Sequence, residues 1–193
     1  MNNFRLKAIS FVLTTVFALL PLKATTQAST LYVAYGATNV VEAFSPTGTD
    51  LGSFASAGLN RPVGLAFDRA GNLYVAGYDT NSIVEFSPTG ISMGTFANTG
   101  LSRPVGLAFD RNGNLYAAND GSNTIERFSP TGADLGAFAS SGLLGPQGLV
   151  FDSGGNLYAA NLNANTIEKF NSAGGDLSFV CQHWLAWPGW SRF

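Results

Sequence analysis

The chain has 193 residues, a formal net charge of −2 and a sequence pI near 5.2. Only 11% of its residues are charged and none of its segments is strongly basic, so we expect no nucleic-acid partner. The single cysteine, Cys181, excludes an internal disulfide framework, while a hydrophobic content of 46% is enough for a packed core.

The first 28 residues have the pattern of a secretory signal peptide. A basic start with Arg5 and Lys7 precedes an apolar run from Ala8 to Leu20 and the small polar stretch KATTQAS. Cleavage after Ala28 fits this pattern. The alternative is an uncleaved membrane anchor, but the apolar run is shorter than the ~20 residues that span a bilayer. We therefore predict a secreted, periplasmic or cell-surface protein with no stable membrane span after cleavage.

The sequence that follows is an array of repeats. Leu-Tyr pairs begin at Leu31, Leu73, Leu115 and Leu157, each 42 residues after the one before. A repeat of 20 to 50 residues is typical of solenoids, propellers and related arrays. Residues 29–180 are therefore predicted to form one repetitive domain.

Each repeat contains the pattern of four short strands. In one copy, VGLAFD (105–110) and LYAAN (115–119) flank RNGN, whose glycine and asparagine favour a hairpin turn. Side chains of TIERFSP (124–130) alternate between two faces, as expected for a strand. PTG forms the next turn, and DLGAFA (134–139) is a fourth strand. No stretch shows sustained helical periodicity. The chain is predicted to be all-β, with four short antiparallel strands per repeat. Four strands in about 40 residues are typical of a propeller blade.

Two segments carry a resemblance to a known family. RPVGLAFDRAGNLYVA (61–76) and RPVGLAFDRNGNLYAA (103–118) resemble NHL-type repeats and the related propellers of the gluconolactonase and virginiamycin B lyase groups. The resemblance covers about residues 31 to 177. It implies a β-propeller that is incomplete, with about three and a half blades of an expected six or so. It implies little about function, because this fold hosts lyases, lactonases, RNA binders and interaction scaffolds.

Polar residues that recur between copies of the repeat are interpreted as parts of the blade. Aspartates and asparagines recur at the predicted hairpin turn, where turn capping is favoured over a metal site: Asp68, Asp110, Asp152, Asn72, Asn114 and Asn156. A second set of asparagines is expected at tight turns: Asn39, Asn81, Asn123 and Asn165. Glutamates recur on the third strand, and we expect them on an exposed strand face rather than in catalysis: Glu42, Glu126 and Glu168.

The candidate ligand face lies where the copies differ. The loops after the second strand differ in sequence, and arginines precede the first strand in two copies where the next has Gly145. In a propeller both sets of loops emerge on the same rim around the central channel, a concave position that favours binding. The candidate ligand-binding residues are Arg61, Tyr78, Asp79, Arg103, Asn119, Asp120 and Asn163. The alternative interpretation is a set of ordinary polar loops.

Signatures of catalysis are mostly missing from the repeats. A mechanism like that of virginiamycin B lyase uses histidine, and no repeat contains one. Asp79, Asn119, Asp120 and Asn163 offer oxygen ligands for Ca²⁺, but their spacing does not establish that they converge, so we assign no metal, cofactor or catalytic residue. The leading interpretation is a non-catalytic scaffold that binds a protein, carbohydrate or small molecule. The alternative is a fragment of a lyase- or lactonase-type propeller enzyme.

The last residues, CQHWLAWPGWSRF (181–193), depart from the repeat. At the repeat spacing, Trp184, Trp187 and Trp190 fall on glycines of the preceding copy. The tryptophan codon TGG, read one base later, begins with GG and encodes glycine. We therefore interpret the tail as an out-of-frame reading of a further repeat, with the shift near Leu177 or Ser178, and the chain as a truncated product. The alternative is a genuine tryptophan-rich cap or membrane-interface tail.

Overall fold

The computed structural model describes residues 17–19 and 30–181. Most of the predicted signal peptide and residues 182–193 of the predicted tail lie outside these residues. The described part of the chain forms four antiparallel sheets, each with its four strands in sequence order.

The strands have the following bounds. Blade 1 contains β1 (Phe17–Leu19), β2 (Leu31–Tyr35), β3 (Val40–Phe44) and β4 (Asp50–Ala55). Blade 2 contains β5 (Pro62–Phe67), β6 (Leu73–Gly77), β7 (Ser82–Phe86) and β8 (Ser92–Ala97). Blade 3 contains β9 (Pro104–Phe109), β10 (Leu115–Asn119), β11 (Thr124–Phe128) and β12 (Asp134–Ala139). Blade 4 contains β13 (Pro146–Phe151), β14 (Leu157–Asn161), β15 (Thr166–Phe170) and β16 (Asp176–Cys181).

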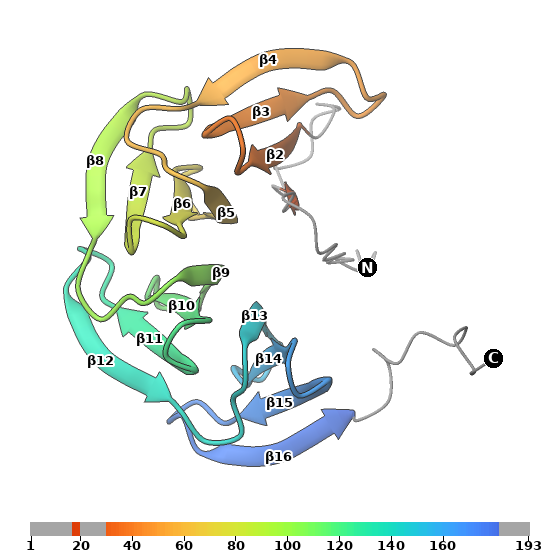
Figure 1. The fold of residues 1–193 in the computed structure, drawn as a ribbon, viewed down its shortest axis with the longest axis vertical. Coiled ribbons are helices and arrows are strands. Elements are labelled where there is room, and N and C mark those ends of the chain that lie inside the picture. Colours follow the sequence, from red (N-terminus) through yellow and green to blue (C-terminus); the bar gives the residue numbers. More distant parts are fainter. Residues whose placement is uncertain (1–16, 20–29, 182–193) are drawn as a thin grey trace.

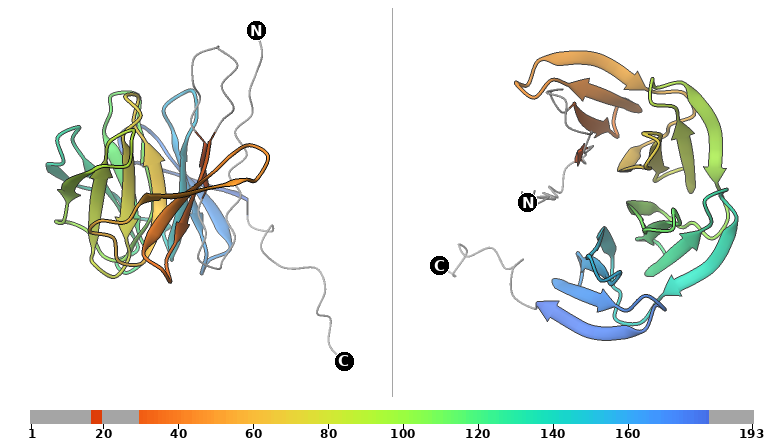
Figure 2. Two further views of the ribbon diagram at one scale, coloured as in Figure 1. Left: turned by 90° about the horizontal axis from the view of Figure 1, so that it is seen from above. Right: turned by 180° about the vertical axis from the view of Figure 1, so that it is seen from behind.

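The four sheets stand side by side in an arc around a common centre (Figure 1). The first strands β5, β9 and β13 lie nearest the centre, and the fourth strands β4, β8, β12 and β16 form the outer wall. Seen from behind, the arc is open between blade 1 and blade 4 (Figure 2, right). This architecture is an incomplete, all-β propeller of four-stranded blades. No helix that could cross a membrane is found in residues 17–19 and 30–181.

The hairpin between the first two strands of a blade is closed by its aspartate. Asp68 Oδ1 accepts hydrogen bonds from the backbone N–H groups of Ala70 and Asn72, at 2.8 and 2.9 Å. Its Oδ2 accepts a bond from Asn72 Nδ2 at 2.8 Å. Asp110 and Asp152 make the same set of bonds in the next blades. The prediction that these residues cap turns is confirmed.

The asparagines expected at tight turns also occupy them. Asn39, Asn81, Asn123 and Asn165 have φ between 50° and 59°. Asparagine tolerates this left-handed conformation better than most residues. Each of these turns joins the second and third strands of a blade.

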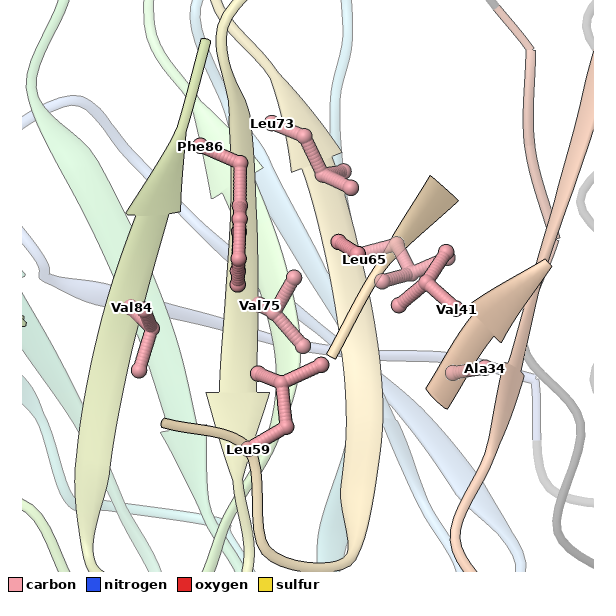
Figure 3. Close-up of a cluster of buried hydrophobic side chains, with 9 residues drawn as sticks. Ala34, Val41, Leu59, Leu65, Leu73, Val75, Val84 and Phe86 are labelled. Atoms are coloured by element: carbon pink, nitrogen blue, oxygen red, sulfur yellow. The ribbon is translucent and has the colours of Figure 1, made fainter. Parts of the chain in front are cut away.

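The hydrophobic core lies between neighbouring blades rather than inside any one of them. At the junction of blades 1 and 2, Val41 packs among Leu65, Leu73, Val75 and Phe86 (Figure 3). At such a site, burying a large apolar side chain contributes about 1.5–3 kcal/mol. The same junction recurs twice more along the arc.

One prediction about the strands is wrong. Glu126 and Glu168 were expected on an exposed face, but each retains only 6% of its accessible surface, and Glu42 is half-buried. The reason is that Glu126 and Glu168 lie against the loops that enter their blades from the preceding ones, at Gly100 and Gly142. A polar side chain can therefore be covered by such a loop even where the strand pattern predicts an exposed face.

Candidate functional site

Two sets of loops meet at one edge of the arc, which we call the rim. In blades 2, 3 and 4, the residue before the first strand accepts a backbone hydrogen bond from the loop after the second strand of the same blade. Tyr78 N–H donates to Arg61 O at 3.1 Å, and Asp120 N–H donates to Arg103 O at 3.2 Å. Leu162 makes the equivalent bond to Gly145 at 2.9 Å. This pairing brings the variable loops and the arginines to the same place.

The side chains at the rim form a connected set across blades 2 and 3. Arg61 Nη1 lies 3.4 Å from Asp79 Oδ1, with both side chains about half exposed. The guanidinium of Arg61 lies over the ring of Tyr78, 4.3 Å from its centroid. The Tyr78 hydroxyl then crosses to the next blade and donates to Asp120 Oδ2 at 3.2 Å.

Two further residues extend this set. Arg103 is exposed, and the adjacent Tyr78 hydroxyl, with a smaller contribution from the Asp120 carboxylate, raises the pKa of its guanidinium. Gln147 on β13 donates from Nε2 to Asp120 Oδ1 at 3.3 Å, so blade 4 contributes as well. We call the six residues the rim network: Arg61, Tyr78, Asp79, Arg103, Asp120 and Gln147.

Gln147 was missed by the sequence analysis. Its position is occupied by Val63 and Val105 in the two preceding blades, so the departure from the repeat is visible in the sequence. That departure lies within a strand, whereas the sequence analysis looked for variation in loops.

The two rim arginines occupy a backbone conformation that does not favour them. Arg61 and Arg103 have φ of 49° and 48°, and the equivalent residue in blade 4 is Gly145, with φ of 61°. This left-handed region is strained for residues other than glycine and, to a lesser degree, asparagine. The backbone therefore selects for glycine here, and the arginines are present in spite of it.

An asparagine from the preceding blade fixes this conformation. Asn39 Oδ1 accepts the Arg61 N–H at 2.7 Å, and Asn81 Oδ1 accepts the Arg103 N–H at 2.6 Å. The same bond joins Asn123 and Gly145 at 2.7 Å. The turn asparagines thus set the position of the rim and hold adjacent blades together.

Asn119 does not belong on the ligand face. Its side chain is fully buried, accepts the Ser102 N–H at 3.1 Å, and donates to Gly100 O at 2.8 Å and to Thr124 Oγ1 at 3.1 Å. Asn161 makes the matching bonds in blade 4. Asn119 is the last residue of β10, and its side chain ties the inter-blade loop to the sheet instead of facing solvent.

Asn163 lies on the rim in blade 4 but apart from the rim network. It is exposed, and its side chain covers the space that a Cβ on Gly145 would need. Among the described residues its side chain makes no hydrogen bond to the rim network. Gly145 thus leaves room for Asn163 at the place where the preceding blades have arginine.

The oxygen ligands considered for Ca²⁺ do not form a common group. Asn119 is turned inward, and the carboxylates of Asp79 and Asp120 already contact Arg61, Tyr78 and Gln147. Across residues 30–181 no group of three or more His, Cys, Asp or Glu side chains could hold a metal ion.

Solved structures with the same architecture were found by comparison of folds. A chain in the crystal structure of the nidogen/laminin complex matches 78% of this chain with a TM-score of 0.69 and 22% identity. The fold is that of a β-propeller. A catalytically inactive variant of virginiamycin B lyase from Staphylococcus aureus, crystallised with quinupristin, matches 83% of the chain with a TM-score of 0.64 and 17% identity. A streptogramin B lyase matches 88% with a TM-score of 0.67 and 13% identity.

This β-propeller spans only part of those structures. It covers 58% of the nidogen/laminin chain, 58% of the virginiamycin B lyase and 55% of the streptogramin B lyase. No protein-family model matches the sequence, and no curated protein matches it. At these identities the likeness describes the fold, so function must be argued from the residues of the chain itself.

Proposed function

We propose that this propeller is an exported, non-catalytic binding scaffold that contacts a protein partner through the rim network. The observation that carries the proposal is the retention of Arg61 and Arg103 at left-handed positions where blade 4 has glycine. Strained positions concentrate at functional sites, where the side chain is needed more than the relaxed backbone. Neither arginine is needed to close its turn, because Gly145 closes the same turn with the same asparagine bond.

The chemistry of the rim network supports a protein partner. Arginine and tyrosine are the residue types, with tryptophan, that most often dominate binding at protein interfaces. Here an arginine is already stacked on a tyrosine, and Asp79 and Asp120 restrain both groups before any partner arrives. Such pre-organisation reduces the entropy lost on binding. The structurally similar nidogen/laminin chain comes from a complex between proteins.

Export is proposed from the signal-peptide pattern of residues 1–28. N-terminal sequencing of the protein from the producing cell tests it. A mature chain that begins after Ala28 would support the proposal, and an intact Met1 in a cytoplasmic fraction would contradict it.

Differential capture tests the proposed binding function. The full chain and its variants are immobilised, exposed to exported proteins of the producing organism, and compared by quantitative mass spectrometry. Arg61→Ala and Arg103→Gly should lose the same captured protein. Arg69→Ala, which removes an exposed arginine outside the rim network, is the matched control and should retain it. Arg103→Gly copies the residue of blade 4, and we expect it to melt at a higher temperature than the wild type.

The outcome of capture is decisive in either direction. A partner retained equally by all variants would show that the rim network is not the contact surface. A lower melting temperature for Arg103→Gly would show that the arginine serves the fold.

A lyase- or lactonase-type enzyme is the second candidate, favoured by the two lyases among the similar structures. Against it stands the composition of the repeats, in which no histidine occurs; the chain's single histidine, His183, lies outside the described residues. Incubation of the full chain with quinupristin, followed by mass spectrometry, separates the candidates. Turnover above the buffer rate would favour the enzyme.

A further inference from the structure

The innermost strand of blade 1 is formed by a different kind of sequence from the innermost strands of the other blades. In blades 2, 3 and 4 this place is filled by six-residue strands that begin with proline: β5, β9 and β13. In blade 1 it is filled by β1, which has three residues and lies within the apolar run of the predicted signal peptide. Figure 1 shows β1 as the short red strand on the inner side of β2.

The register of β1 matches that of the repeat strands. In blade 2, Leu65, Ala66 and Phe67 pair with Val75, Tyr74 and Leu73. In blade 1, Phe17, Ala18 and Leu19 pair with Val33, Tyr32 and Leu31, the residues equivalent by repeat position. Phe-Ala-Leu thus takes the place of Leu-Ala-Phe, with alanine at the same position in both.

The predicted signal peptide, residues 1–28, is called the leader below. The repeat strands carry a glycine, and the leader has none. A Cβ on Gly64 would overlap the carbonyl oxygen of Val105 on β9, and one on Gly106 would overlap that of Gln147 on β13. Glycine is therefore required where one inner strand approaches the next. In the sequence of the leader, the residue before Phe17 is valine, Val16, whereas the residue before Leu65 is glycine. A strand with Gly-Leu-Ala-Phe suits the position better than the leader does.

We propose that the inner edge of β2 is a strand-acceptor site for an extended Gly-Leu-Ala-Phe segment of a partner protein, and that residues 17–19 occupy it in the full chain. Strand addition obtains affinity from main-chain hydrogen bonds and specificity from alternate side chains. Here glycine faces the neighbouring inner strand, and alanine pairs with Tyr32. Removal of the leader leaves this edge unpaired, and an unpaired edge is a template for another chain.

A labelled peptide tests the site. The probe is fluorescein-labelled RPVGLAFD, whose binding to the full chain is measured by fluorescence anisotropy. A second peptide has valine in place of the glycine and should bind at least about tenfold more weakly, equivalent to about 1.4 kcal/mol. Ala18→Pro weakens the pairing of β1, because proline cannot donate to a strand ladder. This variant should bind the glycine peptide at least about tenfold more tightly than the wild type.

Mapping the contact keeps the test independent of any single variant. A photoreactive group at the alanine of the peptide should form adducts with residues 31–35. Phe17→Asp provides a second way to weaken β1, and the melting temperature of each variant reports whether it folds. Equal affinity for both peptides would overturn the proposal. So would adducts on the outer strands, or binding unaffected by both leader substitutions.

Discussion

At the scale of single residues, the buried asparagines show how a blade is joined to the loop before it. Asn119 satisfies one backbone N–H, one carbonyl oxygen and one hydroxyl at once, and its side chain has no exposed surface. Truncation would leave these groups without partners in a place that water does not reach. A buried polar group without a partner costs about 1–3 kcal/mol.

We expect Asn119→Ala to lower the free energy of unfolding by about 2–3 kcal/mol. Urea denaturation measures the change. Asn163→Ala is the matched control: its side chain is exposed, and we expect a change within about 0.5 kcal/mol. Similar losses for the two variants would contradict the structural role of Asn119.

Glu126 is a buried carboxyl group beside a second one. Glu126 and Asp134 both lie against Gly100, so close that a Cβ there would overlap them. Burial, followed by the charge of Asp134 and a hydrogen bond with it, raises the pKa of Glu126 to about 7. The two acids recur together in other blades, as Glu42 with Asp50 and Glu168 with Asp176. Blade 2 has neither of them and carries Val84 and Ser92 instead.

This pair makes stability depend on pH. Because the pKa of Glu126 rises from 4.5 to about 7 on folding, the folded state holds more protons than the unfolded state between these values. The contribution of Glu126 is therefore fully present below pH 4.5 and is lost as the pH rises through about 7, a change of about 3 kcal/mol.

The double variant Glu126→Val, Asp134→Ser copies blade 2 and should remove this dependence. Urea denaturation of wild type and variant at several pH values measures the difference, which cancels the contributions of other groups. A difference that does not change between pH 4.5 and 7 would refute the assignment.

At the scale of elements, the outer strand β16 departs from its equivalents from Ser178 onward, reading Ser-Phe-Val-Cys where β12 has Gly-Ala-Phe-Ala. Ser178 has φ of 75°, where β4, β8 and β12 have Gly52, Gly94 and Gly136 with φ of 88°, 100° and 85°. No atom lies within 4 Å of a Cβ built on Gly136, so only the backbone conformation disfavours a side chain there. Ser178 also marks the point where the proposed change of reading frame begins.

We expect Ser178→Gly to stabilise the protein by about 1 kcal/mol and Gly136→Ser to destabilise it by a similar amount. Thermal melting of the two variants checks this pair. Opposite shifts are required, and a loss of stability in Ser178→Gly would contradict the account. Re-sequencing of the gene across this codon separately tests the frame proposal, which an intact frame with no repeats encoded downstream would refute.

The bounds of the strands could be predicted closely from the turn residues and from the alternation of side chains between the two faces of a strand. LYAAN and DLGAFA coincide with β10 and β12, and the first strand of the blade begins one residue early, at Pro104. Proline fits there because the first residue of a strand need not donate to the ladder. The last strand extends into the predicted tail by one residue, because Cys181 of β16 pairs with Ile167 as Ala139 pairs with Ile125.

The sequence does not show which side chains are covered by the neighbouring blades and their loops. A period of two assigns residues to the faces of a strand, but burial depends on what packs against each face. Glu126 and Asn119 were misplaced for this reason. Tyr78 and Asp120 were placed at the rim because loops with the same repeat position gather at the same edge.

At the scale of the whole molecule, blade 4 shows what a neighbouring blade contributes. Ile167 is 37% exposed, whereas Val41, Ile83 and Ile125 at the same repeat position have no exposed surface. Val150, on the first strand of the same blade, is 53% exposed. The core of this fold is therefore a property of blade pairs, and the face of blade 4 is built like the faces that are covered elsewhere in the arc.

The rim network depends on the same succession of blades. Tyr78, Asp120 and Gln147 come from three consecutive blades and contact one another only because the repeat places them side by side. The rim network is therefore assembled from the loops and strands of three blades, and the binding function that we propose depends on this arrangement.

The most direct measurement is photocrosslinking of the captured partner to the rim. A benzophenone amino acid is placed at Asn163, which lies on the rim outside the rim network, or at Met93 on the outer strand β8, which is 59% exposed. The account predicts an adduct with the partner from position 163 and none from position 93. Adducts from position 93 alone, or equal adducts from both positions, would contradict a binding function at the rim.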